Sequence, residues 1–245
     1  MVVSFFVFIF GTIVGSFLNV VILRYNSGES IIKNSSKCFS CRERLKWYEM
    51  IPVLSFIFQR GRCRHCKSKI SWQYPIVELL TGLVFLLIFL KFQFTLVTSY
   101  YFVVFSILII ISVYDLRHQI IPNLLVYIFD ILAFLNLLLI TNYELRITNF
   151  LAGLCFFAFF ALIWLLSKGR AMGFGDAKLA LGIGWFLGLN KGIFALLLSF
   201  WLGAIVGIFL LIFFNKKYNI KSSIPFGPFL AMGAAVAFLW TKNFF

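Results

Sequence analysis

The chain has 245 residues, of which 62% are hydrophobic and 12% are charged, and its formal net charge at pH 7 is +14. This composition, with a mean hydropathy of +1.00, excludes an ordinary soluble domain and is typical of a polytopic membrane protein. The positive charge does not indicate nucleic-acid binding, because only one basic loop lies outside the apolar segments. We therefore expect a lipid environment and no nucleic-acid partner.

Eight apolar segments approach the length of about 17 to 25 residues that a transmembrane helix needs. The expected fold is an all-α membrane protein, a polytopic bundle of about eight transmembrane helices. The first segment carries no charge before Arg24 and is too long for the core of a signal peptide, so we expect it to be retained. The sixth is short and contains Gly182, Gly184 and Gly188, which leaves its ends the least defined. The segments are approximately 2–23, 75–90, 96–114, 122–140, 149–166, 177–189, 192–214 and 224–240.

Lys and Arg residues predict the orientation, because positive charge is enriched in cytoplasmic loops. With eight spans and both termini outside, 18 of the 22 basic residues lie on the inner side. The remaining four are Lys91, Arg146, Lys191 and Lys242. This asymmetry predicts a cytoplasmic loop at residues 24–74, with attraction to anionic lipid as a secondary effect of the charge.

That loop contains two CxxC pairs, formed by Cys38 with Cys41 and by Cys63 with Cys66. Each pair can form a tight knuckle that presents two sulfurs to one ion, so the spacing indicates a tetrahedral zinc site. Two disulfides are the alternative, which the reducing cytoplasm disfavours. Because all four ligands come from the protein, we expect a structural Zn²⁺ that holds a small domain together.

Aromatic and basic residues alternate around these cysteines. One interpretation is an interfacial aromatic belt with cations that extend to the surface. The other is a platform for the basic part of a substrate or for lipid headgroups. The aromatic members include Trp47, Tyr48, Trp72 and Tyr74, and the basic ones Arg60, Arg62 and Arg64.

Two aspartates, Asp115 and Asp176, lie where apolar segments meet basic loops on the predicted inner side. A carboxylate at membrane depth is costly unless it is neutralised or paired, so a functional site is the first hypothesis for both. Asp176 could instead cap the N-terminus of its helix. Asp115 has no such explanation, because a negative charge at a helix C-terminus opposes the dipole.

A shared active site would explain both aspartates. Two carboxyl groups about 3 Å apart cannot both ionise, so one stays protonated to polarise a carbonyl group while the other accepts a proton from water. Gly173 and Gly175 precede Asp176 in a GxGD run, and glycine allows the backbone to approach a ligand closely. Asp115 and Asp176 are therefore the predicted catalytic pair, with Gly173 and Gly175 in support.

Two further acids compete for a role. Asp130 lies within the fourth segment with no basic residue nearby in sequence, and it either faces a water-filled cavity or stays protonated against a neighbouring helix. Glu78, near the inner end of the second segment, is a possible supporting acid that could pair with an arginine of the loop. Cys155 is expected to be an inert core residue.

Motifs along the chain occur together in a known protein family. They begin with Gly15-Ser16-Phe17-Leu18-Asn19, and continue through the paired CxxC loop and Glu78-Leu79-Leu80-Thr81-Gly82. They end with the Asp115 segment to Ile121-Pro122-Asn123, the GFGD run with Lys178-Leu179, and Ile224-Pro225-Phe226-Gly227-Pro228-Phe229. Over nearly its whole length, the chain thus resembles the type IV prepilin peptidases, membrane aspartic proteases of the GxGD type.

This resemblance implies a catalytic pair of Asp115 and Asp176 that cuts prepilins and pseudopilins between Gly and a following hydrophobic residue, usually Phe, at the inner face of the bacterial cytoplasmic membrane. It also implies N-methylation of the new terminus with S-adenosylmethionine as co-substrate, an activity that the residues do not indicate independently. The corresponding domains are a first helix at 1–23, a cytoplasmic zinc loop at 24–74 and a helical domain at 75–245. The contrary hypothesis is a transporter or channel with intramembrane acids, for which we find no internal repeat.

Overall fold

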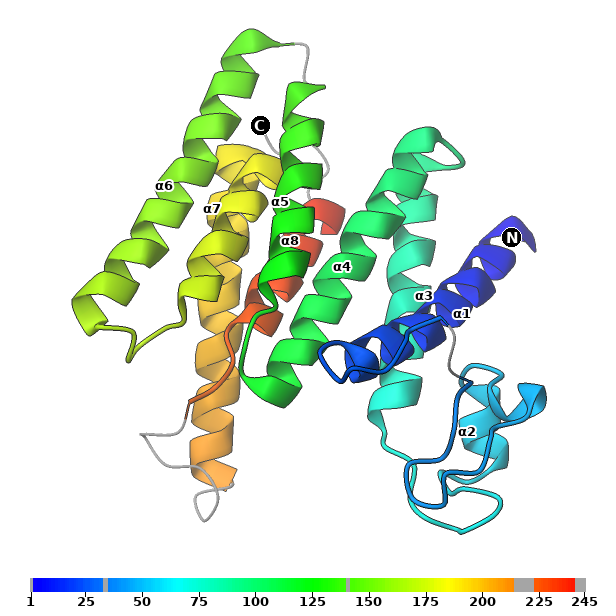
Figure 1. The fold of residues 1–245 in the computed structure, drawn as a ribbon. Coiled ribbons are helices and arrows are strands. Elements are labelled where there is room, and N and C mark those ends of the chain that lie inside the picture. The colour runs from blue at the N-terminus through cyan, green and yellow to red at the C-terminus, as the bar shows by residue number, and fades with distance from the viewer. Residues whose placement is uncertain (1, 33–34, 140–141, 214–222, 241–245) are drawn as a thin grey trace. The chain divides into compact units, whose positions relative to one another are not determined.

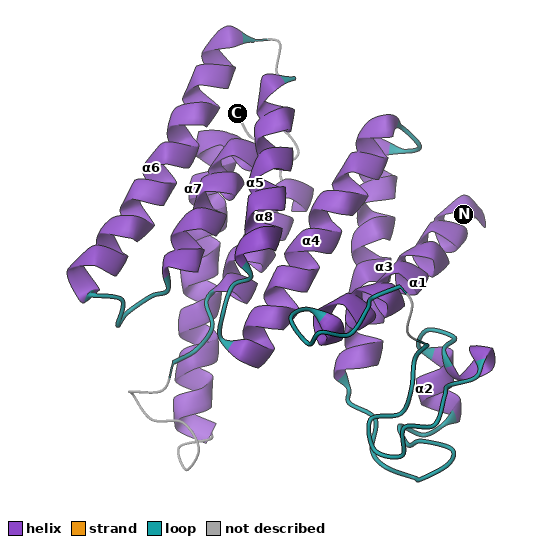
Figure 2. Cartoon of the chain, viewed as in Figure 1, coloured by secondary structure: helices purple, strands orange, loops and turns teal. Residues whose placement is uncertain are grey.

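The computed structural model describes residues 2–32, 35–139, 142–213 and 223–240 (Figure 1). Five basic residues that contribute to the predicted orientation lie outside these residues: Lys33, Lys216, Lys217, Lys221 and Lys242. The described part of the chain is helical and contains no strand (Figure 2). Its helices are α1 (Val2–Arg24), α2 (Leu54–Phe58), α3 (Gln73–Phe92), α4 (Leu96–His118), α5 (Asn123–Leu138), α6 (Tyr143–Ser167), α7 (Phe174–Phe213) and α8 (Gly227–Trp240), with a 3₁₀ turn, η1, at Trp47–Glu49.

The all-α membrane architecture is confirmed. Five helices, α1, α3, α4, α6 and α7, are long and apolar enough to cross a membrane, and α5 and α8 are shorter apolar helices. Most of the predicted segments correspond to one helix each, whereas α7 contains both the sixth and the seventh.

The 40 residues of α7 form two helical segments that meet at Gly188, where φ is 76° and ψ is −173°. The ring of Phe156 contacts both Gly184 and Gly192. Eight residues of uninterrupted helix would separate those glycines by about 12 Å, so the chain must turn back between them. In Figure 1 the yellow first segment ends at this turn, and the orange second segment runs back from it. The prediction of two spans here therefore matches the course of the chain.

The chain divides into two compact units, residues 1–110 and 111–245. In the first unit α1 packs against α3, and a Cβ atom added at Gly11 or Gly15 would lie 2.7 Å from the Cα of Gly82 or Glu78 respectively. The GxxxG run of α1 is therefore a close helix contact, as small residues at this spacing allow. The predicted division into 1–23, 24–74 and 75–245 concerns function and stays a prediction.

In the second unit α7 packs against α5, α6 and α8. A Cβ atom added at Gly203 or Gly207 would make only ordinary contacts, at 3.5 Å or more from the nearest side chain, so this GxxxG run is not a close helix contact. One sequence-based interpretation is wrong here. Cys155 is exposed, so it is not part of the core. Pro122 is the N-cap of α5, whose first helical residue is Asn123.

Candidate active site and metal centre

Asp115 lies in the last turn of α4 and is only 3% exposed. Its Oδ2 atom accepts a hydrogen bond of 3.1 Å from the backbone N–H of Gly227, the first residue of α8. The first N–H groups of a helix have no partner within the helix, and they carry the positive end of its dipole. A carboxylate that the dipole of α4 disfavours is thus stabilised by the dipole of α8.

Asp176 lies in the first turn of α7 and is 6% exposed. Because α7 begins at Phe174, Asp176 is the third residue of the helix, and the N-cap alternative is wrong. Its own N–H donates to the carbonyl oxygen of Gly173 at 3.2 Å. Its Oδ1 atom is buried and has no hydrogen-bond partner among the described residues. This oxygen is therefore available as a proton acceptor.

Ile121, in the turn between α4 and α5, lies between the two aspartate segments. A Cβ atom added at Gly175 would be 2.8 Å from the Cβ of Ile121, and one added at Gly227 would be 3.3 Å from its Cδ1. The carboxyl groups of Asp115 and Asp176 also interact electrostatically. The structure therefore brings the two predicted aspartates into one site, although 61 residues separate them in sequence.

Gly173 and Gly175 lie beside this pair. A Cβ atom added at Gly173 would be 3.5 Å from Oδ2 of Asp176, an ordinary contact, whereas Gly175 has no room for a side chain against Ile121. Gly175 is thus required by packing, whereas packing against Asp176 does not by itself require a glycine at position 173. Two buried carboxyl groups in one site can act together on a water molecule, one as a proton donor and the other as a proton acceptor.

Asp130, the competing acid, belongs to a separate polar contact between α5 and α7. Its Oδ1 atom is buried without a hydrogen-bond partner among the described residues and packs against Gly182. One turn earlier on α7, Nζ of Lys178 donates to Oδ1 of Asn123 and to the hydroxyl group of Tyr127, both at 3.0 Å. This contact lies beside the aspartate pair and does not include it.

The carboxylate of Glu78 accepts a hydrogen bond from the backbone of the loop and does not pair with an arginine. Its Oε2 atom accepts a hydrogen bond of 2.7 Å from the N–H of Val53. Val53 has φ 61° and ψ −51°, and the N–H of Leu54 bonds to the carbonyl oxygen of Pro52 at 2.6 Å. These features define a γ-turn, a strained conformation for a β-branched residue. Glu78 therefore fixes the 24–74 loop to α3, and its predicted pairing with an arginine is not found.

The four loop cysteines converge, and their Sγ atoms lie within 4.8 Å of one another. The two CxxC segments have the same backbone geometry. Arg42 and Lys67, which follow the second thiol of each pair by one residue, both have φ 58°, and their N–H groups donate to the carbonyl oxygens of Cys38 and Cys63. Each segment is closed by an antiparallel bridge, Lys37 to Arg44 and Arg62 to Lys69. The expected pair of knuckles is therefore present.

The donor set fits a metal ion. Four sulfurs at about 2.3 Å from a tetrahedral Zn²⁺ would be about 3.8 Å apart, and the Sγ atoms of Cys38 and Cys66 are separated by 3.8 Å. Hydrogen bonds favour the thiolate form of two of these residues, Cys38 and Cys66. The N–H of Cys41 lowers the pKa of the Cys38 thiol to about 6, and the Ser68 hydroxyl and amide lower the pKa of the Cys66 thiol. All four described loop thiols are free, so the disulfide alternative is not found.

Sequence reasoning missed two residues that shape the aspartate site. The backbone N–H of Gly227 and the side chain of Ile121 contact it, yet both were noted only as parts of a motif. A glycine followed by proline at the start of an apolar helix is a signal for an exposed helix N-terminus. What that terminus binds depends on tertiary structure.

Two family models match the chain. The bacterial peptidase A24 N-terminal domain matches residues 9–92, and the type IV leader peptidase family matches residues 102–208. The second match includes both Asp115 and Asp176, and the first includes the four cysteines and Glu78. No solved structure gives a significant match.

Several curated relatives match over most of their length. A prepilin leader peptidase/N-methyltransferase of Bacillus subtilis is 34% identical over 234 residues, which cover 95% of this chain and 92% of the relative. A prepilin leader peptidase/N-methyltransferase of Aeromonas hydrophila is 31% identical over 263 residues, which cover 96% of this chain and 89% of the relative. A type 4 prepilin-like proteins leader peptide-processing enzyme of Escherichia coli is 32% identical over 249 residues. The match covers 91% of this chain and 88% of the relative.

Proposed function

Since the chain belongs to the type IV leader peptidase family, we propose that it is a membrane aspartic endopeptidase and N-methyltransferase acting on type IV prepilins and pseudopilins. The observation that carries the peptidase assignment is the meeting of two buried carboxyl groups, Asp115 and Asp176, in one site. The family and this site favour an enzyme over the transporter or channel alternative.

In the proposed reaction one carboxyl group is protonated and donates a hydrogen bond to the scissile carbonyl oxygen. The other is ionised and accepts a proton from water, whose oxygen attacks the carbonyl carbon. The C–N bond of the tetrahedral intermediate then breaks, and the leaving amine takes a proton from a carboxyl group. We assign proton acceptance from water to Oδ1 of Asp176, and we assign to the Gly227 N–H the orientation of Asp115.

The substrate class is the one that the family implies, and the place of the site along the chain is compatible with it. Both aspartates are at helix ends that precede or follow loops with basic residues, so the proposed scissile bond lies where a short basic leader meets an apolar pilin helix. Gly173 and Gly175 support Asp176 in this proposal. Orientation with both termini periplasmic places the site at the cytoplasmic face of the inner membrane.

We further propose that Cys38, Cys41, Cys63 and Cys66 hold a structural Zn²⁺, which would cross-link the two knuckles and take no direct part in peptide cleavage. Metal analysis of the purified full chain should find about one zinc per chain, and Cys→Ser changes at all four positions should remove it. Freshly prepared wild type without bound metal would contradict this assignment.

Methylation of the newly exposed N-terminal amine would use S-adenosylmethionine as co-substrate. The amine loses a proton and receives the methyl group from the sulfonium. Incubating the reconstituted protein with a prepilin and labelled methyl donor, then weighing the N-terminal peptide, tests both activities. We expect loss of the leader and a gain of one methyl group. An unchanged prepilin would overturn the proposed peptidase, and cleavage without the methyl group would overturn only the second activity.

A further inference from the structure

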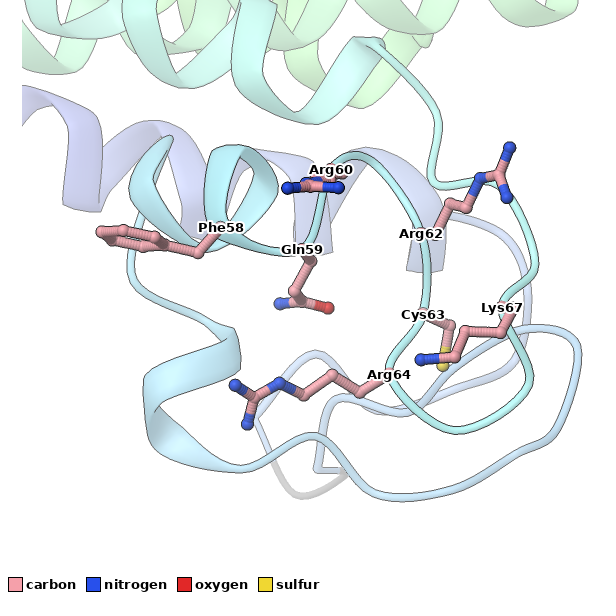
Figure 3. A pocket seen from close by; sticks show the side chains of 7 residues that line it. All are labelled: Phe58, Gln59, Arg60, Arg62, Cys63, Arg64 and Lys67. Carbon is pink, nitrogen blue, oxygen red and sulfur yellow. The ribbon is translucent and has the colours of Figure 1, made fainter.

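The tetracysteine loop contains a cavity of about 310 Å³ that has no part in the proposed cleavage reaction (Figure 3). Its lining is mostly basic and consists of Phe58, Gln59, Arg60, Arg62, Cys63, Arg64 and Lys67. We propose that this cavity binds the headgroup of an anionic phospholipid, and that the adjoining helix α2 lies in the membrane interface.

The depth of α2 is fixed by its bond to α3. The Val53 N–H, immediately before α2, donates to Oε2 of Glu78 at 2.7 Å. Glu78 is the sixth residue of α3, about 7.5 Å along the axis from the start of this membrane-spanning helix. Because both α1 and α3 join the loop at the same end of their packed pair, α2 is placed at the level where these helices enter the membrane.

Three apolar side chains of α2 are exposed. Leu54 is 51% exposed, Ile57 is 59% exposed and Phe58 is 81% exposed. Their spacing of i, i+3 and i+4 places them on one face of the helix. An apolar face at the membrane boundary, followed directly by cations, is the arrangement of an interfacial helix that binds anionic lipid.

The cations behind α2 surround the cavity from opposite sides. Figure 3 shows the guanidinium group of Arg60 on one side, that of Arg64 on the other, and the amino group of Lys67 extending across the space toward Cys63. Arg64 is held over the ring of Tyr48, with its Cζ atom 5.2 Å from the ring centroid. A phosphate group in this space would be approached by several donors, as charge-assisted phosphate binding requires.

No carboxylate neutralises these cations among the residues that the structure describes. The described salt bridges of the loop join Glu29 to Arg24 and Lys37, and the Glu49 carboxylate accepts the N–H of Lys46. A Zn²⁺ bound by four thiolates would carry about two negative charges, which is fewer than the four cations that line the cavity. The excess charge is complementary to an anionic headgroup.

The test uses the full chain, purified in an uncharged detergent, with bound lipid measured by native mass spectrometry. Dioleoyl phosphatidylglycerol is compared with dioleoyl phosphatidylcholine, and millimolar inorganic phosphate is added in a third arm. The cavity variant is Arg60→Gln/Arg64→Gln/Lys67→Gln. Its matched control, Arg42→Gln/Arg44→Gln/Lys46→Gln, removes the same charge from the same loop outside the cavity lining.

We expect wild type and the control variant to prefer phosphatidylglycerol at least about tenfold, and the cavity variant to lose this preference. Equal loss in both triple variants would show a general charge effect and overturn the proposal. Displacement of the lipid by inorganic phosphate would also overturn it, because the site would then take a free anion.

A second variant keeps the proposal testable if the triple cavity variant does not fold. Phe58→Ser changes an exposed side chain, so the loop should keep its fold. We expect it to reduce retention of phosphatidylglycerol severalfold, since it removes apolar surface from the interfacial face of α2. Unchanged retention would mean that α2 does not lie in lipid.

Discussion

At the scale of single residues, Asp115 is held by a helix other than its own. Its carboxylate lies at the C-terminal end of α4, where the helix dipole disfavours it, and accepts the first N–H of α8. This bond spans 112 residues of sequence. The contact gives the buried charge a partner and leaves the second oxygen of the carboxyl group for other interactions.

Replacing Gly227 with alanine should displace Asp115. The added Cβ atom would lie 2.7 Å from Oδ2 of Asp115, too close for either group to keep its position. A shift of about 1 Å in a catalytic group can reduce rate by about 100-fold, so we expect a loss of prepilin cleavage of that order. The measurement is the rate of leader removal by the reconstituted protein.

Gly207→Ala is the matched control, because its Cβ atom would meet only Ile224 at 3.6 Å. It should retain near wild-type cleavage. Equal activity of the Gly227→Ala and Gly207→Ala variants would show that the bond to Asp115 does not matter.

Replacing Glu78 with alanine should weaken the attachment of the 24–74 loop. Loss of this part-buried hydrogen bond should cost about 1 kcal/mol, so we expect a lower midpoint of thermal unfolding in detergent. Glu78→Gln keeps an oxygen that can accept from Val53 and should restore most of the loss. Glu43→Ala, at an exposed position of the same loop, is the control. If Glu78→Gln lowers the midpoint as much as Glu78→Ala does, the hydrogen bond to Val53 is not the cause of the lost stability.

The aspartates could be predicted from sequence because a charge near lipid is rare and costly, which limits the candidates to a few positions. The two cysteine knuckles could be predicted because their spacing is local. The Gly227 N–H and the Ile121 contact could not, since they depend on where α8 and the turn before α5 pack. The supporting role of Glu78 stays a prediction, and its partner in the structure is a backbone N–H, which sequence does not distinguish from an arginine.

At the scale of elements, the turn at Gly188 determines the course of α7. Sequence predicted two apolar spans that end and begin near this residue, and the glycines left the ends of the first one the least defined. It did not show that the chain turns back at Gly188 itself. This turn requires one residue with positive φ and close contact with Asn149 of α6, neither of which composition reveals.

Gly188→Ala should therefore destabilise the second unit. Alanine is disfavoured at φ 76°, and its Cβ atom would collide with the side chain of Asn149. The two effects together should cost about 2–4 kcal/mol. Gly203→Ala, in the second segment of α7, is the control. Its Cβ atom would lie 3.5 Å from the nearest side chain, so stability should be unchanged or slightly improved. The measurement is the midpoint of thermal unfolding of both variants in detergent. Equal midpoints would show that the turn does not require a glycine at position 188.

At the scale of the whole molecule, the orientation in the membrane decides on which face cleavage occurs. The basic residues predict that the turn after α3 lies outside and the turn after α6 lies in the cytoplasm. Reporter fusions after Gln93 and after Lys168 should therefore report opposite compartments, with the second in the cytoplasm. The reverse result would place the aspartates on the periplasmic face, away from the basic leader of a prepilin.

The most direct test concerns the two aspartates as a catalytic pair. Asp115→Asn and Asp176→Asn keep the size of each side chain and remove its ability to exchange a proton. Each variant alone should lower the rate of leader removal by about 100-fold or more, while its zinc content and thermal unfolding stay like those of wild type. Leader removal at the wild-type rate by either properly folded variant would contradict the account.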